Sequence, residues 1–536
     1  MNTAKTFTFI LALSLLLTAC NTLQTPAETE SSIQVVPTAP VVEIPPAPDY
    51  SNAVKLVLDD SGITLDGAPV GADPQAAVYL ANDIVYYEAG KDFTYGEGTE
   101  QDAHSPEEAA AHTVVHITQP GAYRLSGQLT LGQVAVDLGE DAKKDPQAVV
   151  TLVLEGLDIS CQVAPAIIFY NVYECGNDDA DQATKDVDTT AAGANVVIAD
   201  NTVNLVNGAY VARIYKPDSV VLNEDKTAVE DAKKLHKYDA AFYSKRSMNI
   251  FGEADNSGIL RIQAENEGLD SEMHLTLNGG NIQIQSGNDG INTNEDGISV
   301  TTVNGGSLYI KVTGETGEGD GIDSNGWLVI NGGTVTALAC SNSADAGIDS
   351  DMGIHINGGT VLATGNMLDQ IEGTGQNYAV FSFAQTQSGG ETVTLKAQDD
   401  TTLLEATLEN AYSILIYSNY TLVPGTYHLY SGGKQLAGTS GGMGGMGGGM
   451  MGRPGGMQPN MQPGEMTPPD RPNGAQQLPQ GQQPPTDFTM PNDFTMPQGG
   501  RPDNFNGTPM NSQESSPEFI IQNGGNMFSG IAPVSA

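Results

Sequence analysis

Acidic and amide side chains recur at a regular interval between residues 268 and 359. Each recurrence is Gly, an apolar residue and Asp or Asn, followed further along by Asn-Gly-Gly. Carboxylate and amide oxygens are the ligands of hard cations such as Ca²⁺, which takes about six to eight oxygens. We therefore predict calcium ligands at these repeat positions. The candidates are Asp270, Asp289, Asn292, Asp296, Asp320, Asp323, Asp345, Asp349 and Asp351.

The length of the interval indicates which elements hold these side chains. The Asn-Gly-Gly triplets begin at Asn278, Asn304, Asn331 and Asn357, in steps of 26, 27 and 26 residues. Repeats of this length that contain only strand-forming segments are typical of solenoids and are too short for propeller blades. The chain is predicted to be all-β, with residues 51–435 forming a right-handed parallel β-helix of coils of about 22–31 residues.

Stacked coils would bring like charges together. Coils of a β-helix lie ~4.8 Å apart, and two carboxylates at that separation repel by about 3.5 kcal/mol at an effective dielectric of about 20. Between Gly268 and Gly359 the only lysine or arginine is Lys311, so a bound cation would have to neutralise the acids. The alternative is that Asx side chains cap turns or bond to one another, which we prefer for the Asn-Gly-Gly asparagines.

Composition limits the partners. The 536 residues include 65 acidic and 22 basic side chains, a formal net charge of -43. Nucleic acid and anionic lipid surfaces would repel such a chain. Cations, neutral polymers, or acidic polymers bridged by cations fit it better, and we expect a monomer.

The N-terminus predicts export. Lys5 precedes an apolar run over residues 7–17, which ends in Leu-Thr-Ala-Cys at Cys20. This is the pattern of a bacterial lipoprotein signal, with an ordinary secretory signal as the alternative. Residues 1–20 are thus expected to be a signal peptide, Cys20 the lipidated residue and 21–50 a flexible linker. The protein would be anchored in a membrane and face the periplasm or the cell exterior.

The remaining cysteines and the C-terminal region give further expectations. In an oxidising compartment Cys161 and Cys175 can form a disulfide, although the odd number of cysteines leaves the pairing open. The polar insert 223–239 suits a short surface helix or a loop. Residues 436–536 are rich in Gly, Met, Pro and Gln, and such a composition predicts a disordered tail.

Three segments carry a family resemblance: "GDGIDSNGWLVINGGTVT", "DAGIDSDMGIHINGGTV" and "YDAAFYSKRSMNIFG". They resemble a bacterial secreted β-helix family described as a carbohydrate-binding domain, which is similar in fold to calcium-dependent polysaccharide lyases of the pectate type. The resemblance covers most of residues 51–433. It implies a noncatalytic domain that binds Ca²⁺ and polysaccharides such as cellulose or pectin-like acidic glycans. The chain departs from the pattern where Gly-Ile-Asp becomes Gly-Ile-Asn at Asn292.

Two classes of function follow. As a binding protein, the chain would hold sugars on aromatic side chains, for which the repeat region offers Phe242, Tyr243, Tyr309 and Trp327, each of which also suits the core. As a calcium-dependent lyase acting on uronide polymers, it would need a basic side chain to remove a proton. The coils offer Lys245, Arg246, Arg261 and Lys311 for that task. A structural adhesin is a third hypothesis.

Overall fold

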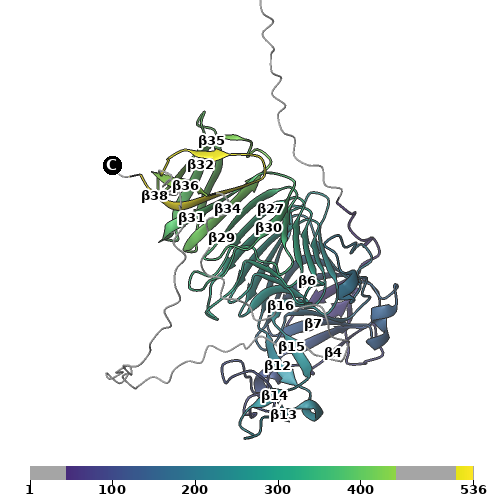
Figure 1. Cartoon of the computed structure of the whole chain (residues 1–536). Helices are drawn as coiled ribbons and strands as arrows, with labels where there is room; N and C mark the ends of the chain where they lie inside the picture. The colour runs from purple at the N-terminus through teal and green to yellow at the C-terminus, as the bar shows by residue number, and fades with distance from the viewer. Residues whose placement is uncertain (1–43, 442–514, 535–536) are drawn as a thin grey trace, which may run out of the picture. The chain divides into compact units, whose positions relative to one another are not determined.

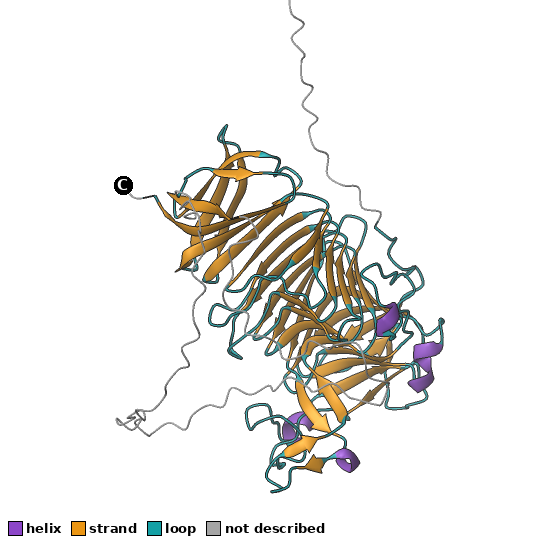
Figure 2. Cartoon of the chain, in the orientation of Figure 1, coloured by secondary structure: helices purple, strands orange, loops and turns teal. Residues whose placement is uncertain are grey.

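The computed structural model describes residues 44–441 and 515–534 (Figures 1 and 2). Strands dominate this part of the chain, so the all-β prediction is confirmed. Its helical elements are short: α1 (Pro106–Ala110), η1 (Glu140–Lys144), η2 (Ala180–Gln182) and η3 (Pro217–Ser219). Among these residues, no helix has the length and apolar character needed to cross a membrane.

Three ladders of parallel strands position the repeat. In the first ladder each strand pairs in parallel with the next one named. Its strands are β1 (Val54–Leu58), β6 (Gly121–Leu129), β8 (Val150–Cys161), β10 (Ala194–Ile198), β17 (Met248–Gly252), β20 (Leu275–Leu277), β23 (Val300–Val303), β26 (Trp327–Ile330), β28 (Ile354–Ile356) and β30 (Ile371–Thr374).

The second ladder starts from the far half of β8 and belongs to the same large sheet. It continues through β11 (Val203–Gly208), β18 (Ile259–Ala264), β21 (Asn281–Ser286), β24 (Ser307–Val312), β27 (Thr334–Leu338) and β29 (Thr360–Gly365). Its strands alternate buried and exposed positions, because successive side chains of a strand point to opposite faces.

The third ladder is a separate eight-stranded sheet and carries the predicted site. Its strands pair in parallel except at β4, which is antiparallel to β5. They are β4 (Val78–Ala81), β5 (Thr113–Ile117), β7 (Gly132–Asp137), β9 (Ile167–Asn171), β16 (Ala240–Ser244), β19 (Glu267–Ser271), β22 (Ile291–Thr293) and β25 (Ile322–Ser324).

The apolar residue of each repeat lies in the core between these ladders. Leu269, Ile291, Ile322 and Ile348 are completely buried and occupy one register position, as an inward aliphatic stack requires. The Asn-Gly-Gly triplets form the corners. The second glycine of each triplet has a positive φ between +76° and +86°, a conformation that other residues rarely adopt.

A hairpin insert lies between β11 and β16. Its strands are β12 (Val211–Tyr215), β13 (Val221–Leu222), β14 (Val229–Asp231) and β15 (Lys234–Tyr238), which pair as β12 with β15 and β13 with β14 (Figure 1). The segment 223–239 is therefore mainly strand and turn, and the helix considered for it does not form. Near the N-terminus, β2 (Thr64–Leu65) and β3 (Ala68–Pro69) form a small antiparallel extension of β1.

Beyond β30 the pairing becomes mostly antiparallel. The strands here are β31 (Tyr378–Gln387), β32 (Glu391–Ala397), β33 (Thr402–Leu408), β34 (Tyr412–Asn419), β35 (Gly425–Ser431), β36 (Lys434–Gly441), β37 (Phe519–Ile521) and β38 (Gly525–Pro533). β29 pairs antiparallel with β34, and β31 pairs with both β34 and β38.

The prediction of disorder over 436–536 is wrong at both ends of that range. β36 continues to Gly441, and β37 and β38 return to the C-terminal sheet. The physical reason is a local apolar pattern within a polar tail: Phe519 and Phe528 are buried and pack against Phe381, with ring centroids 5.4 and 5.3 Å away from it. The middle of the tail, 442–514, lies outside the described residues, as do the signal peptide, Cys20 and most of the linker.

The expected disulfide is absent. Cys161, Cys175 and Cys340 are all free thiols. Cys161 ends β8 with its side chain buried in the apolar core, whereas Cys175 lies in the loop after β9 and is half-buried. Burial raises the pKa of both thiols to about 12, so neither is poised as a thiolate.

Candidate functional site

The register of the third ladder places acids and amides of successive repeats side by side. Asp270 on β19 pairs with Asn292 on β22, and Asn292 pairs with Asp323 on β25. The isolated bridge between Ile322 and Ile348 carries the row on to Asp349. The predicted ladder of these four side chains therefore exists in the fold.

A second row runs three residues before the first. Asp289 and Asp320 precede Asn292 and Asp323 by that interval, and Glu267 stands in the same relation to Asp270. Glu267 is not among the predicted ligands, although it occupies the same repeat position as Asp289 and Asp320. Asp289 Oδ1 accepts a hydrogen bond from the Asp320 backbone N–H at 2.6 Å, which links adjacent coils.

Three carboxylates come together at the start of this ladder, and we call Asp239, Glu267 and Asp270 cluster one. All three are buried, and each contributes an oxygen lying within 4.8 Å of the others. Asp239 was also missed, because it precedes β16, where the repeat is degenerate. Cluster one is thus formed by the residues that lead into β16 and by both ends of β19.

Cluster one contains polar atoms that lack partners. Among the described residues, no hydrogen-bond donor reaches Glu267 Oε2, Asp270 Oδ2 or the amide oxygen of Asn292, and all three atoms are buried. The Asn292 Nδ2 donates to Glu267 Oε1 at 3.2 Å, which places Asn292 beside the cluster. A buried polar atom without a partner costs about 1–3 kcal/mol. A cation would satisfy several such oxygens at once.

The hairpin insert brings a lysine to cluster one. Lys237 on β15 lies with its Nζ 2.7 Å from Asp239 Oδ2. Asp239, together with the more distant Glu267 and Asp270, raises the pKa of Lys237 above its usual range, so its ammonium stays charged. One lysine opposite three carboxyl groups leaves an acidic surplus. The repeat could not predict this positive charge, because Lys237 belongs to the hairpin insert, which lies outside the repeat.

A second group lies two coils further on, and we call Asp320, Asp323 and Asp349 cluster two. Their carboxylate oxygens also lie within 4.8 Å of one another, but these residues are half-buried. Asp320 Oδ1 accepts a hydrogen bond from the Ala346 backbone N–H at 2.6 Å, which orients that carboxyl group. All three members are among the predicted calcium ligands.

The electrostatics of the ladder oppose ionisation. Burial, followed by the neighbouring Asp349 and Asp323, raises the pKa of Asp320 to about 9. Burial and Asp239 raise the pKa of Glu267 to about 8, and the pKa values of Asp270 and Asp289 are raised for the same two kinds of reason. The raised pKa values indicate that these carboxyl groups either stay protonated or are neutralised by a bound cation.

The other predicted ligands are members of neither cluster, although Asp289 and Asn292 contact them. Asp345 Oδ2 accepts a hydrogen bond from the Gly319 backbone N–H at 2.6 Å and bonds to the Ser343 hydroxyl. Asp296 is exposed and accepts from Asn325 Nδ2 at 3.0 Å. Asp351 is exposed and belongs to neither group. Asp289 is buried between the two clusters, and Asn292 adjoins cluster one.

The Asn-Gly-Gly asparagines bond to one another, as preferred from the sequence. Asn304 donates to Asn278 at 2.8 Å, Asn331 to Asn304 at 2.9 Å and Asn357 to Asn331 at 2.8 Å, each through Nδ2 to Oδ1. This continuous amide ladder accounts for these side chains without a ligand. The amide ladder lies at the Asn-Gly-Gly turns. Its asparagines are structural, and they are distinct from the two rows of acids and amides on the third ladder, which we call the acidic ladder.

Two of the aromatic sugar-binding candidates are wrong. Phe242 is completely buried and stacks on Phe169 in the core, and Tyr243 is buried with its hydroxyl bonded to Glu272. Neither can contact a polymer, because Phe242 points into the packed interior and Tyr243, on the opposite face of β16, is covered by Tyr238 of the hairpin insert, with ring centroids 5.2 Å apart. Tyr309 is half-buried and donates to Glu409 at 3.0 Å, while Trp327 is half-buried at the start of β26.

The structure shows where three of the basic candidates for lyase chemistry lie. Lys311 pairs with Glu409 at 2.5 Å, and Arg261 donates to Gln283 at 3.0 Å, so both lie on the second ladder away from the acids. Lys245 follows β16, and its ammonium lies 5.3 Å from the ring of Tyr170 and 5.1 Å from that of Tyr238. Burial lowers the pKa of Lys245, the direction required of a general base.

Comparison with known proteins gives one family. The model of a family described as carbohydrate-binding domain-containing protein matches residues 111–410. The chain belongs to this family. The match contains the whole acidic ladder and ends before the C-terminal sheet is complete.

Among solved structures, the chain is similar to one titled "Structure of the polysaccharide lyase-like protein from C. thermocellum, Gadolinium derivative". The two share 19% sequence identity, with 57% of this chain and 92% of that chain covered and a TM-score of 0.31. Comparison with curated proteins gives no match.

Proposed function

We propose that this chain is an exported lipoprotein that binds polysaccharide without cleaving it, through a right-handed parallel β-helix stabilised by Ca²⁺. Membership of the carbohydrate-binding family supports the sugar part of the proposal. The parallel pairing of successive coils in three ladders supports the β-helix. The Lys5-to-Cys20 signal pattern supports export and lipidation.

The observation that carries the calcium proposal is the set of unpartnered oxygens at cluster one. Glu267, Asp270 and Asn292 each hold a buried oxygen that no donor reaches among the described residues. With Asp239 they form an all-oxygen donor set, which suits a hard cation and not zinc or copper. Cluster two offers a second all-carboxylate set that is closer to solvent.

The two sets would act differently toward a glycan. A cation held by the buried cluster one would stabilise the coils. A cation held by the half-buried Asp320, Asp323 and Asp349 could keep coordination positions open to solvent. An acidic sugar carboxylate could occupy such a position, which would let a chain of net charge -43 retain a pectin-like polymer.

Glycan retention tests this function. The full chain is incubated with cellulose, pectin and chitin, with calcium and with a chelator. We expect retention on at least one polymer, with pectin retention lost in chelator. The matched variants are Asp323→Asn, in cluster two, and Asp296→Asn, outside both clusters; only the first should lose pectin. If no polymer retains the chain under any condition, the binding function is wrong and the adhesin hypothesis gains support.

A lyase is the second candidate, because Lys245 combines a lowered pKa with a position directly after β16, the strand that pairs with β19. The test is the ultraviolet absorbance of unsaturated uronide during incubation with polygalacturonate and calcium. A steady rise that Lys245→Met abolishes would establish elimination and contradict the noncatalytic proposal. We expect no rise.

A further inference from the structure

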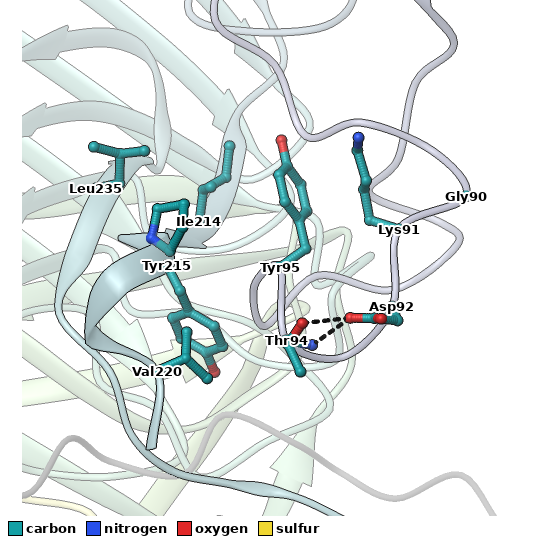
Figure 3. A pocket seen from close by; sticks show the side chains of 10 residues that line it. Gly90, Lys91, Asp92, Thr94, Tyr95, Ile214, Tyr215, Val220 and Leu235 are labelled. Carbon is teal, nitrogen blue, oxygen red and sulfur yellow. Dashed lines mark hydrogen bonds between the residues drawn. The ribbon is translucent and has the colours of Figure 1, made fainter. Parts of the chain in front are cut away.

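Two adjoining hollows lie between the 84–95 segment and the hairpin insert, and their lining residues belong to neither acidic cluster. Their volumes are about 490 Å³ and about 270 Å³. They share Tyr95, Ile214 and Leu235 as lining residues, so they are neighbouring parts of one groove. Figure 3 shows the larger hollow, with Tyr95 facing Ile214, Tyr215 and Leu235 across it.

The groove is lined by rings and aliphatic groups of unequal exposure: Tyr95 is half-buried, whereas Tyr215 is buried, with 8% of its surface exposed. Tyr95 and Tyr215 line the larger hollow, and Tyr86 and His236 line the smaller one beside the shared Tyr95. The side chain of Leu235 is 44% exposed, which is unusual for a large apolar residue. A pyranose ring has an apolar C–H face that packs on aromatic and aliphatic surfaces, with hydroxyls left at its edge for polar groups.

The tyrosine rings are held in place by the fold. Tyr95 packs edge to face against Tyr87, with ring centroids 5.1 Å apart. The Tyr215 hydroxyl donates to Glu97 at 3.3 Å, and the Tyr215 backbone N–H donates to the Tyr95 carbonyl at 2.8 Å. Rings fixed before binding lose little entropy when a ligand arrives.

The charges around the groove are paired within the protein. Lys91 forms an ion pair with Glu88 at 3.0 Å. Asp92 Oδ1 accepts from the backbone N–H and the hydroxyl of Thr94, at 2.9 and 2.6 Å (Figure 3). An anionic ligand would have to compete with Glu88 for Lys91 and would lie near the Asp92 carboxylate, and a cationic ligand would be repelled by Lys91, whereas a neutral ligand meets neither obstacle. The groove therefore favours an uncharged ligand.

We propose that this groove binds two successive units of an uncharged polysaccharide, with sugar faces packed on Tyr95 and Leu235 and with Tyr215 at the floor of the groove. The inference rests on the proposed function, because it takes glycan binding from the family. It deepens that function by giving neutral glycans a place separate from the calcium-dependent ladder. Half of the groove comes from the 84–95 segment, which precedes the family match at residue 111.

The experiment titrates the full chain by calorimetry with uncharged hexasaccharides of glucose, xylose, mannose and N-acetylglucosamine, in calcium. Leu235→Ser and Tyr95→Ala are expected to weaken the strongest binder at least tenfold. Leu235→Ser changes an exposed side chain, so it tests the groove even if Tyr95→Ala unfolds. Phe93→Ala, in the same loop but not in the lining, and Tyr420→Ala, on a distant exposed site, serve as controls and should bind as the parent does.

The outcomes separate the groove from the general function. Equal binding by Leu235→Ser and the parent chain would overturn the groove proposal while leaving a carbohydrate-binding protein. Binding of polygalacturonate in calcium without binding of any neutral hexasaccharide would do the same. Failure of the parent chain to bind either kind of glycan would instead overturn the proposed function.

Discussion

Cluster one and cluster two lie on one acidic ladder, two coils apart, but their surroundings differ. Cluster one is buried and has the ammonium of Lys237 2.7 Å from Asp239, delivered by an insert that is not part of the repeat. Cluster two is half-buried and consists only of residues of the repeat itself. The two clusters therefore differ in their source of positive charge. The ammonium of Lys237 partly neutralises cluster one, and an exchangeable metal ion would neutralise cluster two.

Replacing Lys237 should give the largest effect. Lys237→Met leaves Asp239 and Glu267 buried without the fixed ammonium. We expect a loss of about 3 kcal/mol, the lower end of the range for a broken buried ion pair, because the Lys237 side chain is 35% exposed. Chemical denaturation with and without calcium measures this loss, which calcium should reduce. Lys234→Met, which removes an exposed partner of Glu272, is the matched control and should cost under about 1 kcal/mol. Equal losses in the two variants would show that Lys237 has no special role.

Calcium removal should give the next largest effect. An ion at 100 times its dissociation constant stabilises the folded state by about 2.7 kcal/mol. For a domain of this size that corresponds to roughly 3 °C in melting temperature for each ion. Differential scanning calorimetry in calcium and in chelator checks this. An unchanged midpoint would contradict a calcium role in the fold.

The stability of the calcium-free protein should decrease as the pH rises. The pKa values of Glu267 and Asp320, about 8 and about 9 when folded, are above their unfolded values, so the folded state binds more protons. Stability is then greatest near pH 5 and falls as the pH rises to 9, by at most about 1.4 kcal/mol per pH unit and group. Denaturation in chelator at pH 5, 7 and 9 measures this. A stability that rises across this range would contradict the raised pKa values.

Neutralising one carboxylate of cluster two should reduce the stabilisation by calcium, with little effect on stability in chelator. Asp320→Asn abolishes one source of repulsion, so we expect the chelated variant to be as stable as the chelated parent, or up to about 1 kcal/mol more stable. In calcium it should gain less than the parent does. Asp296→Asn is the matched control, since Asp296 lies outside both clusters, and should respond to calcium as the parent does.

The amide ladder should show the smallest effect. Asn331→Ala removes a donor to Asn304 and an acceptor for Asn357, each partly exposed to solvent. We expect a loss of about 1 kcal/mol that does not depend on calcium. A loss that calcium reverses would place the asparagines in the metal site.

The sequence was sufficient wherever the repeat itself determined the structure. The spacing of Asn-Gly-Gly predicted the amide ladder, and Gly-apolar-Asx predicted both the inward stack of Leu269 and Ile291 and the row of Asp323 and Asp349. The repeat could not predict contacts made by segments outside it. Lys237 reaches cluster one through a hairpin with its own fold.

The average composition of the C-terminal tail did not predict the strands near its end. The tail averages as polar and glycine-rich, yet two buried phenylalanines, Phe519 and Phe528, return its last residues to a sheet. Aromatic residues within the repeat, such as Phe242, suggested sugar contacts because sequence alone does not say which face of a strand is interior. The tyrosines of the groove were missed, since they come from the 84–95 segment and the insert, which are distant in sequence.

Calcium binding by the purified full chain tests the central claim most directly. The measurement is isothermal titration of chelator-treated protein with Ca²⁺, backed by elemental analysis after dialysis, for the parent and for the double variant Asp320→Asn/Asp323→Asn. We predict one ion per cluster in the parent and the loss of the cluster-two ion in the double variant. No heat of binding and no retained metal in the parent would contradict the account.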